Sequence, residues 1–300
     1  MALSENSECG TDLEKRVIST EISPTCNLKC PECNVGKRLH VNQKERRNDP
    51  ELAEKIIEYA PLNSTLLFVG LGEPTIPYSQ ERIKKILHER QDVKGFIQTN
   101  GTYPLTEETI KLIENERLEI GLSLDQQHFV GGQKNLRIQR EYVESISTIV
   151  TDEENKYTLP EGFPKLNRIL VSPLLVERKI VNSWERLSET VVAYQEMAKG
   201  KIAIYTELPP PVKEDNKELF EEVDGKLTPL DSNGWRKSKE HGFYVDMEPT
   251  TPRNSMRILI DGRYIDIPIL AAESWKEVDK YSKPLTNLPK VFDLETGRYE

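Results

Sequence analysis

Three cysteines lie close together near the start of the chain, in the run CNLKCPEC over residues 26–33. Cys26, Cys30 and Cys33 are spaced by four and three residues, and the whole chain contains four cysteines. A structural metal site uses four ligands, and a disulfide framework uses an even number of cysteines. Thiolates bind zinc and iron–sulfur clusters. The spacing is therefore compatible with a reactive metal centre, in which one coordination position is left open for a reactant.

The same spacing is compatible with a second kind of site. Zinc could be bound by the three cysteines together with Cys9 or His40 as a fourth ligand. Such a protein would be a zinc-stabilised binding module without catalysis, which would meet a partner through its acidic C-terminal region. The cysteine run alone does not decide between the two.

The composition limits the class of protein. The chain has 300 residues and a formal net charge of −9. An extended nucleic-acid partner is not expected, because phosphate binding depends on clustered Lys and Arg. A membrane span needs about 20 consecutive apolar residues, and no run of the sequence approaches that length. The first 16 residues carry charges and lack the apolar core of a signal peptide. We therefore expect a cytoplasmic protein with reduced thiols and no membrane partner.

Short apolar strands alternate with amphipathic helices along the first two thirds of the chain. Strands are expected over 17–22, 65–69, 95–99, 118–124, 168–176 and 201–208. Helices are expected from Asp49 and Pro50 onward and over 80–89, 107–115, 141–150 and 184–198. This alternation predicts a parallel α/β sheet, either open and doubly wound or curved into a partial (β/α)6 barrel. In both architectures the functional residues follow the carboxyl ends of the strands.

The pattern changes after residue 208, where three prolines form a stiff break. The acidic stretch 214–224 is expected to be a solvated helix. Asp261-Gly262 predicts a tight hairpin within 256–269. We therefore expect an N-terminal segment 1–16, a barrel over 17–208, and a smaller α+β extension over 209–300 that covers the substrate side.

Further motifs follow the cysteine run in order, each on an expected strand. Residues 68–76 are FVGLGEPTI, residues 97–101 are IQTNG, and residues 121–125 are GLSLD. Together with CNLKC at 26–30, they resemble the radical SAM superfamily in its CxxxCxxC signature, its Gly-Gly-Glu motif and its third and fourth strands. The resemblance covers residues 17–125. It implies a partial (β/α)6 TIM-like barrel.

The resemblance also implies cofactors and roles. A 4Fe–4S cluster would bind S-adenosylmethionine and cleave it reductively, giving a 5′-deoxyadenosyl radical that abstracts hydrogen from a substrate. The cluster ligands would be Cys26, Cys30 and Cys33. Gly72 and Glu73 would hold the methionine amino group. Ser123 and Asp125 are candidates for the ribose hydroxyls or the methionine carboxylate, and Asn100 is a further candidate at the end of the third strand.

The sequence departs from the family pattern at two places. Glu32 stands where an aromatic or apolar residue usually precedes the third cysteine, and Leu71 replaces the first glycine of Gly-Gly-Glu. Both changes leave the cluster ligands intact but put the adenine contacts in question. His128, which follows the fourth strand, is expected to be a surface loop residue.

No cysteine follows Cys33. We therefore expect a single cluster, without the auxiliary clusters of many peptide-modifying relatives. The expected substrate is a small metabolite, a nucleotide or a short peptide. The expected electron donor is a flavodoxin or a ferredoxin.

Overall fold

The computed structural model describes slightly more than half of the chain. The described residues are 17–30, 48–69, 72–125, 128, 131–133, 135–150, 161–173, 175–176, 179–180, 184–199, 201–207, 235–237, 244–246, 257–259, 261–265, 282–288, 292–293 and 298–299. Cys33 and the acidic stretch 214–224 lie outside them. Within the described part, no helix is long and apolar enough to cross a membrane.

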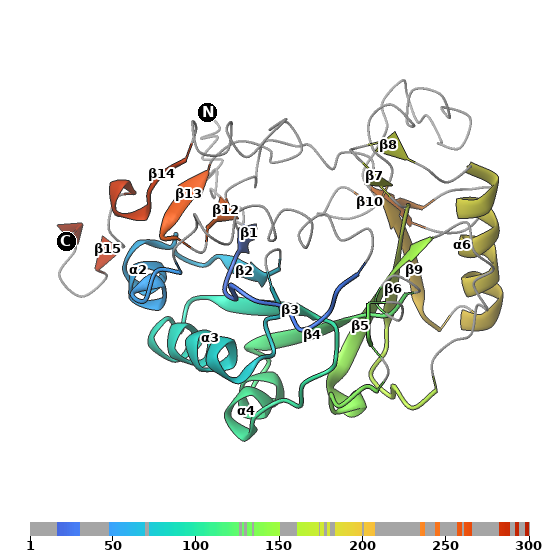
Figure 1. Ribbon diagram of the computed structural model, residues 1–300, viewed down its shortest axis with the longest axis horizontal. Coiled ribbons are helices and arrows are strands. Elements are labelled where there is room, and N and C mark those ends of the chain that lie inside the picture. Colours follow the sequence, from blue (N-terminus) through green and yellow to red (C-terminus); the bar gives the residue numbers. More distant parts are fainter. Residues whose placement is uncertain are drawn as a thin grey trace, which may run out of the picture.

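Seven parallel strands form the centre of the molecule (Figure 1). They are β1 (Val17–Thr20), β2 (Thr65–Phe68), β3 (Lys94–Thr99), β4 (Leu118–Ser123), β5 (Val143–Val150), β6 (Arg168–Pro173) and β9 (Ala203–Glu207). Each strand pairs in parallel with the next one along the chain. A doubly wound sheet reverses its strand order at a switch point, and this sheet does not. The expected partial barrel is therefore confirmed.

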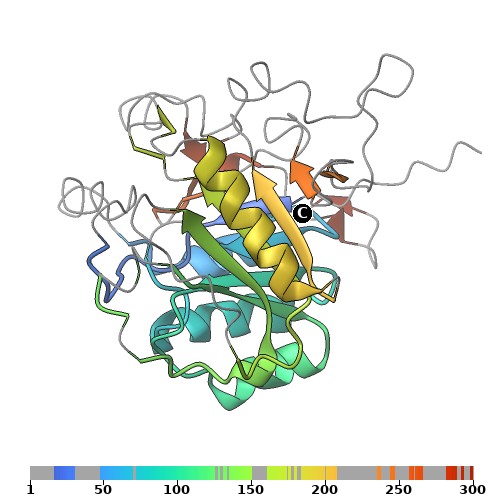
Figure 2. The same ribbon diagram turned by 90° about the vertical axis from the view of Figure 1, so that its right-hand side faces the viewer.

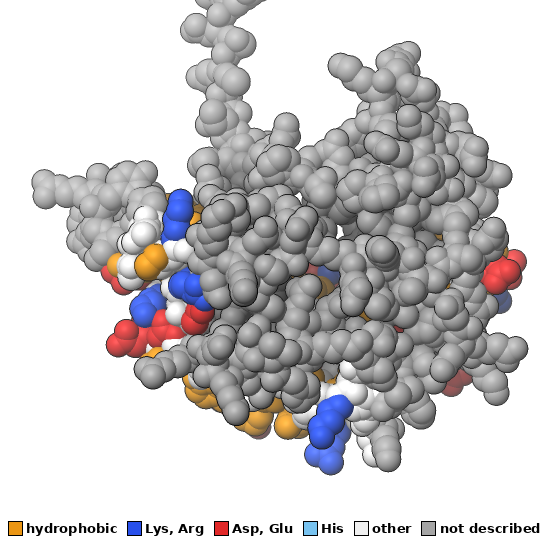
Figure 3. Space-filling model, turned by 45° about the horizontal axis from the view of Figure 1, so that its top comes forward, with side chains coloured by type: hydrophobic (Ala, Val, Ile, Leu, Met, Phe, Trp, Pro, Cys, Tyr) orange, Lys and Arg blue, Asp and Glu red, His pale blue; other side chains and the backbone are white. Residues whose placement is uncertain are grey.

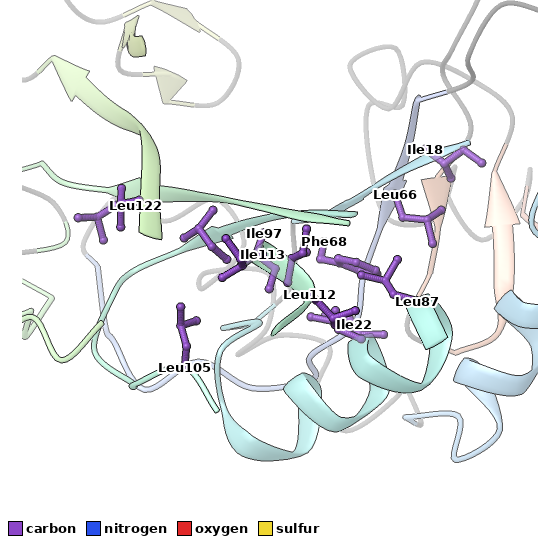
Figure 4. Packing of buried hydrophobic residues seen from close by; sticks show 14 of the residues in the cluster. Ile18, Ile22, Leu66, Phe68, Leu87, Ile97, Leu105, Leu112, Ile113 and Leu122 are labelled. Carbon is purple, nitrogen blue, oxygen red and sulfur yellow. The ribbon is translucent and has the colours of Figure 1, made fainter. Parts of the chain in front are cut away.

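Helices cover one face of this sheet (Figures 1 and 2). They are α2 (Leu52–Tyr59), α3 (Pro77–Glu89), α4 (Glu107–Glu114) and α6 (Trp184–Ala198). Alternate residues of each strand point toward them; these are buried and mostly apolar, as Figure 4 shows for Ile18, Leu66, Phe68 and Ile97. The opposite, inner face of the same strands carries the polar residues that matter for the site.

The expected helix over 141–150 is wrong. Residues Val143–Val150 form strand β5, preceded by a short 3-10 turn, η1 (Arg140–Tyr142). The segment VESISTIV is rich in β-branched residues, which favour strands. Its burial nearly alternates, so that one face packs against the helix layer and the other, with Ser147, is half-buried. A period close to two therefore describes this segment better than a helical one.

Other boundaries shift by a few residues. α2 begins at Leu52, because the Asp49 side chain accepts the N–H of Glu51 in a turn before the helix instead of capping it. α3 begins earlier than expected, at Pro77, a position that suits proline. The expected strand 168–176 ends at Pro173, and Leu175–Val176 (β7) pairs with Lys179–Ile180 (β8) in a small separate hairpin.

Strands from the C-terminal region extend the sheet at both edges. At one edge β12 (Arg257–Ile258) pairs in parallel with β1 and forms the expected hairpin with β13 (Arg263–Ile265), followed by β14 (Lys283–Pro284) and the 3-10 turn η5 (Leu285–Asn287). At the other edge β11 (Tyr244–Asp246) pairs with β9, and β10 (Trp235–Lys237) with β11. A further pair is β15 (Phe292–Asp293) with β16 (Arg298–Tyr299). The domain boundaries at 16 and 208 stay predictions.

The surface charges near α2 and α3 are of mixed sign. Lys55 pairs with Asp49, Lys84 with Glu81 and Lys85 with Glu54. Figure 3 shows basic and acidic side chains intermingled on the described part of this face. The two exposed pairs, Lys84–Glu81 and Lys85–Glu54, contribute little stability, and on this face the described residues form no surface of a single sign.

Candidate active site

Four segments that follow neighbouring strands meet at the carboxyl edge of the sheet. The cysteine loop follows β1, the Gly72-Glu73 turn follows β2, Asn100 follows β3, and Ser123 ends β4. Parallel strands bring these positions to one edge, and hydrogen bonds link all four segments. Of the residues expected at the site, only Cys33 lies outside the described part of the chain.

The cysteine loop is fastened to the end of β3. Cys26 is exposed and Cys30 is half-buried. The Sγ of Cys26 accepts the N–H of Leu28 at 3.4 Å and the side-chain amide of Asn100 at 3.7 Å. Asn27 accepts the same Asn100 amide through Oδ1 at 3.1 Å and donates to Thr102 at 2.9 Å. N–H groups directed at sulfur stabilise a thiolate and adjust a metal bound to it.

Gly72 allows the turn after β2 to approach the cysteine loop. Its φ of +76° lies in the left-handed region that glycine adopts without strain. A Cβ at this position would lie 2.4 Å from the carbonyl oxygen of Ser23 and 2.5 Å from that of Thr25. The next residue, Glu73, donates its N–H to the Thr25 carbonyl at 2.7 Å. Glycine is therefore required here by backbone contact as well as by conformation.

Glu73 is a buried carboxylate surrounded by donors, with 2% of its surface exposed. Oε1 accepts the Thr75 N–H at 2.9 Å, the Thr75 hydroxyl at 2.5 Å and the Thr99 hydroxyl at 2.6 Å. Oε2 accepts the backbone N–H of Asn100 at 2.8 Å. A carboxylate offers about four lone-pair positions, two on each oxygen. Oε2, with one donor, is thus the oxygen that has room for a ligand.

Ser123 belongs to a polar row on the inner face of the sheet. The side-chain amide of Gln98 on β3 donates to the hydroxyls of Ser123 on β4 at 3.0 Å and Ser147 on β5 at 2.9 Å. Gln98 reaches β5 because Gly121 lies between them, where a Cβ would come within 2.5 Å of its Oε1. Sequence reasoning missed both Gln98 and Ser147.

Asp125 is bound to a neighbouring histidine. Both of its carboxylate oxygens lie 2.9 Å from Nδ1 of His128, and Oδ1 also accepts the His128 backbone N–H at 2.9 Å. The Asp125 side chain is 1% exposed, whereas that of His128 is 22% exposed. His128 is therefore part of the candidate site, and the expectation of a merely superficial loop histidine is corrected.

A charged group lies farther from the cysteines, near the amino ends of the strands. Arg168 on β6 pairs with Glu119 on β4 at 2.5 Å, and its guanidinium lies 5.7 Å from the ring centre of Phe96. Burial, and then the nearby charge of Glu119, raise the pKa of Glu144 above its ordinary value, although Arg168 acts in the opposite direction. The group lies toward the opposite ends of β3 and β4 from Asn100 and Ser123.

The comparisons with known proteins agree with this geometry. Residues 20–129 match the family model described as Radical SAM superfamily. This stretch is thus similar to the radical SAM domain over its cysteine run and its first four strands. The superfamily uses a 4Fe–4S cluster and S-adenosylmethionine. The zinc-binding module that the cysteine spacing left open has no support from these matches.

Solved structures that contain S-adenosylmethionine share the fold. A structure described as native anSMEcpe with bound AdoMet has a TM-score of 0.52 at 16% identity, over 90% of this chain and 78% of that one. Streptococcus suis SuiB bound to S-adenosylmethionine has a TM-score of 0.51 at 14% identity, over 91% of this chain and 62% of that one. The chain thus spans less than two thirds of the SuiB length. No curated protein matches the sequence.

Proposed function

We propose that Cys26, Cys30 and Cys33 bind a single 4Fe–4S cluster, and that the carboxyl ends of β2, β3 and β4 bind S-adenosylmethionine beside it. When bound, the cluster supplies the electron that cleaves S-adenosylmethionine into methionine and a 5′-deoxyadenosyl radical, which takes a hydrogen atom from the substrate. The observation that carries this proposal is that Asn100 contacts both the Cys26 sulfur and Glu73, so the thiol and carboxylate sites adjoin.

The residues present suit these cofactors. Cys26 already accepts two N–H donors at its sulfur, as a cluster thiolate does. Oε2 of Glu73 has room for a further donor. We assign it the amino group of S-adenosylmethionine, a charge-assisted contact, with the Gly72 turn allowing that group to come close to the backbone.

Ser123 and Asp125 receive different roles. The Ser123 hydroxyl oxygen accepts from Gln98, so its own hydrogen is available to an acceptor such as a ribose hydroxyl or a carboxylate. Asp125 is engaged by His128 through both oxygens. We therefore assign Asp125 to holding the His128 imidazole at the edge of the site, and Ser123 to direct cofactor contact. Asn100 supports the cysteine loop.

The substrate is proposed to be a small metabolite, a nucleotide or a short peptide. Support comes from the inner face of the sheet, where Gln98, Ser123 and Ser147 form a half-buried polar row next to the cofactor positions. Such a row suits a ligand with hydroxyl, carbonyl or amide groups. The electron is proposed to come from a flavodoxin or a ferredoxin, with no extended nucleic acid and no membrane partner, in the cytoplasm.

One experiment tests the proposal. The protein is reconstituted anaerobically with iron and sulfide, then given S-adenosylmethionine and dithionite, and 5′-deoxyadenosine is measured by mass spectrometry. We expect about four irons per chain, as one 4Fe–4S cluster contains, together with 5′-deoxyadenosine. Both should be lost when Cys26, Cys30 and Cys33 are replaced by alanine.

The fourth cysteine provides the matched control. A Cys9→Ala variant should keep the iron and the 5′-deoxyadenosine, because Cys9 lies outside the CxxxCxxC run. Binding of zinc with no iron, or equal iron in the triple variant and the wild type, would contradict the assignment of the three ligands.

A further inference from the structure

The segment 131–133, which follows β4 in the chain, lies directly against the cysteine loop. The backbone N–H of Lys29 donates to the carbonyl oxygen of Gly131 at 2.9 Å. Beside this bond, a Cβ at position 131 would lie 2.7 Å from the Sγ of Cys30, 2.8 Å from its nitrogen and 2.9 Å from its Cα. Real Cβ atoms essentially never come so close to other atoms, and two of these three cannot rotate away.

The need for glycine at this position comes from Cys30 and not from the local backbone. Gly131 is not among the glycines with a positive φ, whereas its neighbour Gly132 has a φ of +114°. The space around Gly132 is also different, since a Cβ there would meet only Leu28, at 3.8 Å. Gly131 therefore acts through its missing side chain, which lets the segment touch the cysteine closely.

Gln133 anchors this segment to the sheet. It is 5% exposed, and its side-chain amide donates to the carbonyl oxygens of Asn100 at 2.5 Å and Ser123 at 2.9 Å. These two carbonyls lie at the carboxyl ends of β3 and β4. Its backbone N–H donates to the carbonyl oxygen of His128 at 3.0 Å, which closes the segment on itself. Both amide hydrogens are thus used to fix the segment relative to two strands.

We propose that Gly131 is a positioning residue for Cys30, and that Gln133 holds it in place, so that residues 131–133 form one wall of the cluster pocket. This inference rests on the proposed function, because it takes Cys30 to be a cluster ligand. Groups that contact a metal ligand fix its direction and contribute to metal affinity. Here the wall connects Cys30 to the same strand ends, at Asn100 and Ser123, that are assigned to the second cofactor.

Cysteine alkylation of the metal-free protein tests the proposal without any radical chemistry. The reduced protein is treated with iodoacetamide, and modification of Cys26 and Cys30 is followed by mass spectrometry, with Cys26 as the internal reference. In a Gly131→Ala variant the added Cβ pushes the cysteine loop away, so Cys30 should be alkylated faster relative to Cys26. After reconstitution, its cluster affinity should fall about tenfold, the lower end of the loss typical for a contact to a metal ligand.

Two further variants separate positioning from general loss of stability. Gly162→Ala imposes a φ of +84° on alanine but meets only Arg140, at 3.5 Å, so it should reduce stability and leave the Cys30 to Cys26 ratio unchanged. Gln133→Leu keeps the side-chain size but removes both donors, and it should shift the ratio in the same direction as Gly131→Ala. If Gly131→Ala does not fold, as judged by circular dichroism, Gln133→Leu decides the question.

The outcomes are distinct from those of the proposed function. The positioning role would be overturned if a folded Gly131→Ala variant had the wild-type ratio of Cys30 to Cys26 alkylation and the wild-type iron content. If Gly131→Ala does not fold, a wild-type alkylation ratio in Gln133→Leu would overturn it. A shifted ratio in a chain that never holds a cluster would leave the contact standing and refute the cluster instead. A shifted ratio with reduced iron supports both.

Discussion

Replacing Glu73 by glutamine should destabilise the protein even when no cofactor is bound. In the better of the two amide orientations, the glutamine oxygen takes the place of Oε1 and keeps the donors from Thr75 and Thr99. The amide nitrogen then takes the place of Oε2 and faces the N–H of Asn100, which lies 2.8 Å away. Two donors oppose each other, and a buried N–H loses its acceptor. The other orientation is worse, because it places the amide nitrogen against three donors.

The size of the effect follows from these contacts. Leaving a buried donor without an acceptor costs about 1–3 kcal/mol, and hydrogen bonds to a charged group are worth about 1.5–3 kcal/mol against about 1 for neutral ones. Part of the loss is recovered, because the neutral amide is cheaper to bury than a carboxylate. We expect the free energy of unfolding to fall by about 2–4 kcal/mol.

Urea unfolding of the metal-free protein, followed by circular dichroism, measures this difference. Glu89→Gln is the matched control, because Glu89 is exposed on α3 and surface substitutions stay within about 0.5 kcal/mol. If the Glu73 variant were as stable as this control, the buried donor network would not be the reason for a glutamate at this position. The residue would then be explained by the cofactor alone.

Three further predictions concern glycines and a half-buried carboxyl group. Gly72→Ala should destabilise the protein, because the residue has a φ of +76° and the new Cβ would lie 2.4 and 2.5 Å from two backbone carbonyl oxygens. Backbone strain alone costs about 1–3 kcal/mol, so we expect a larger loss of stability; an unchanged melting temperature would contradict this. Gly262→Ala should loosen the β12–β13 hairpin, because the residue has a φ of +77° and the new Cβ would lie 2.1 Å from the Asp49 carboxylate. Amide hydrogen exchange in the hairpin should increase, and unchanged exchange would refute the contact. For Glu144, burial and the charge of Glu119 raise the pKa in the folded state, so stability present at low pH is lost as the pH rises through that value. Glu144→Gln should therefore be more stable than the wild type in urea at pH 7, with the difference vanishing below about pH 4, where the unfolded carboxyl is protonated as well; a wild type that is the more stable at pH 7 would contradict this.

The strands that sequence reasoning located correctly are those with continuous apolar or β-branched runs, such as Thr65–Phe68 and Lys94–Thr99. Their buried faces are set by local composition, and the following motifs mark where each ends. β5 was missed because its inner-facing positions carry Ser145 and Ser147, which dilute the apolar signal. Only the pairing of β5 with β4 and β6 fixes these residues as a strand.

The residues of the candidate site also fall into those that the sequence predicts and those that it does not. Glycine and carboxylate motifs after strands carry a spacing that can be recognised, so Gly72 and Glu73 were expected from the sequence. Gln98 and Gln133 have no such spacing, because each acts through a single amide that meets partners 10 to 49 residues away. Gly121 offered a signal, since a glycine inside a strand often marks a close approach of another group, but nothing local says which group approaches.

The corrected β5 changes what the inner face of the sheet can do. If 141–150 were a helix on the outside, the polar row would end at Ser123 and Gln98 would have one hydroxyl to bind. As a strand, β5 places Ser147 opposite Ser123 in the pairing register, and Gln98 crosses Gly121 to reach it. Both serine oxygens then accept from one amide, and the Ser147 hydroxyl donates to the Ser123 oxygen at 3.4 Å, so the Ser123 hydrogen is the one left for a further acceptor. The polar row thus ends in one available hydroxyl donor, Ser123, which Gln98 and Ser147 hold next to the proposed cofactor positions and which suits an acceptor oxygen of a ligand.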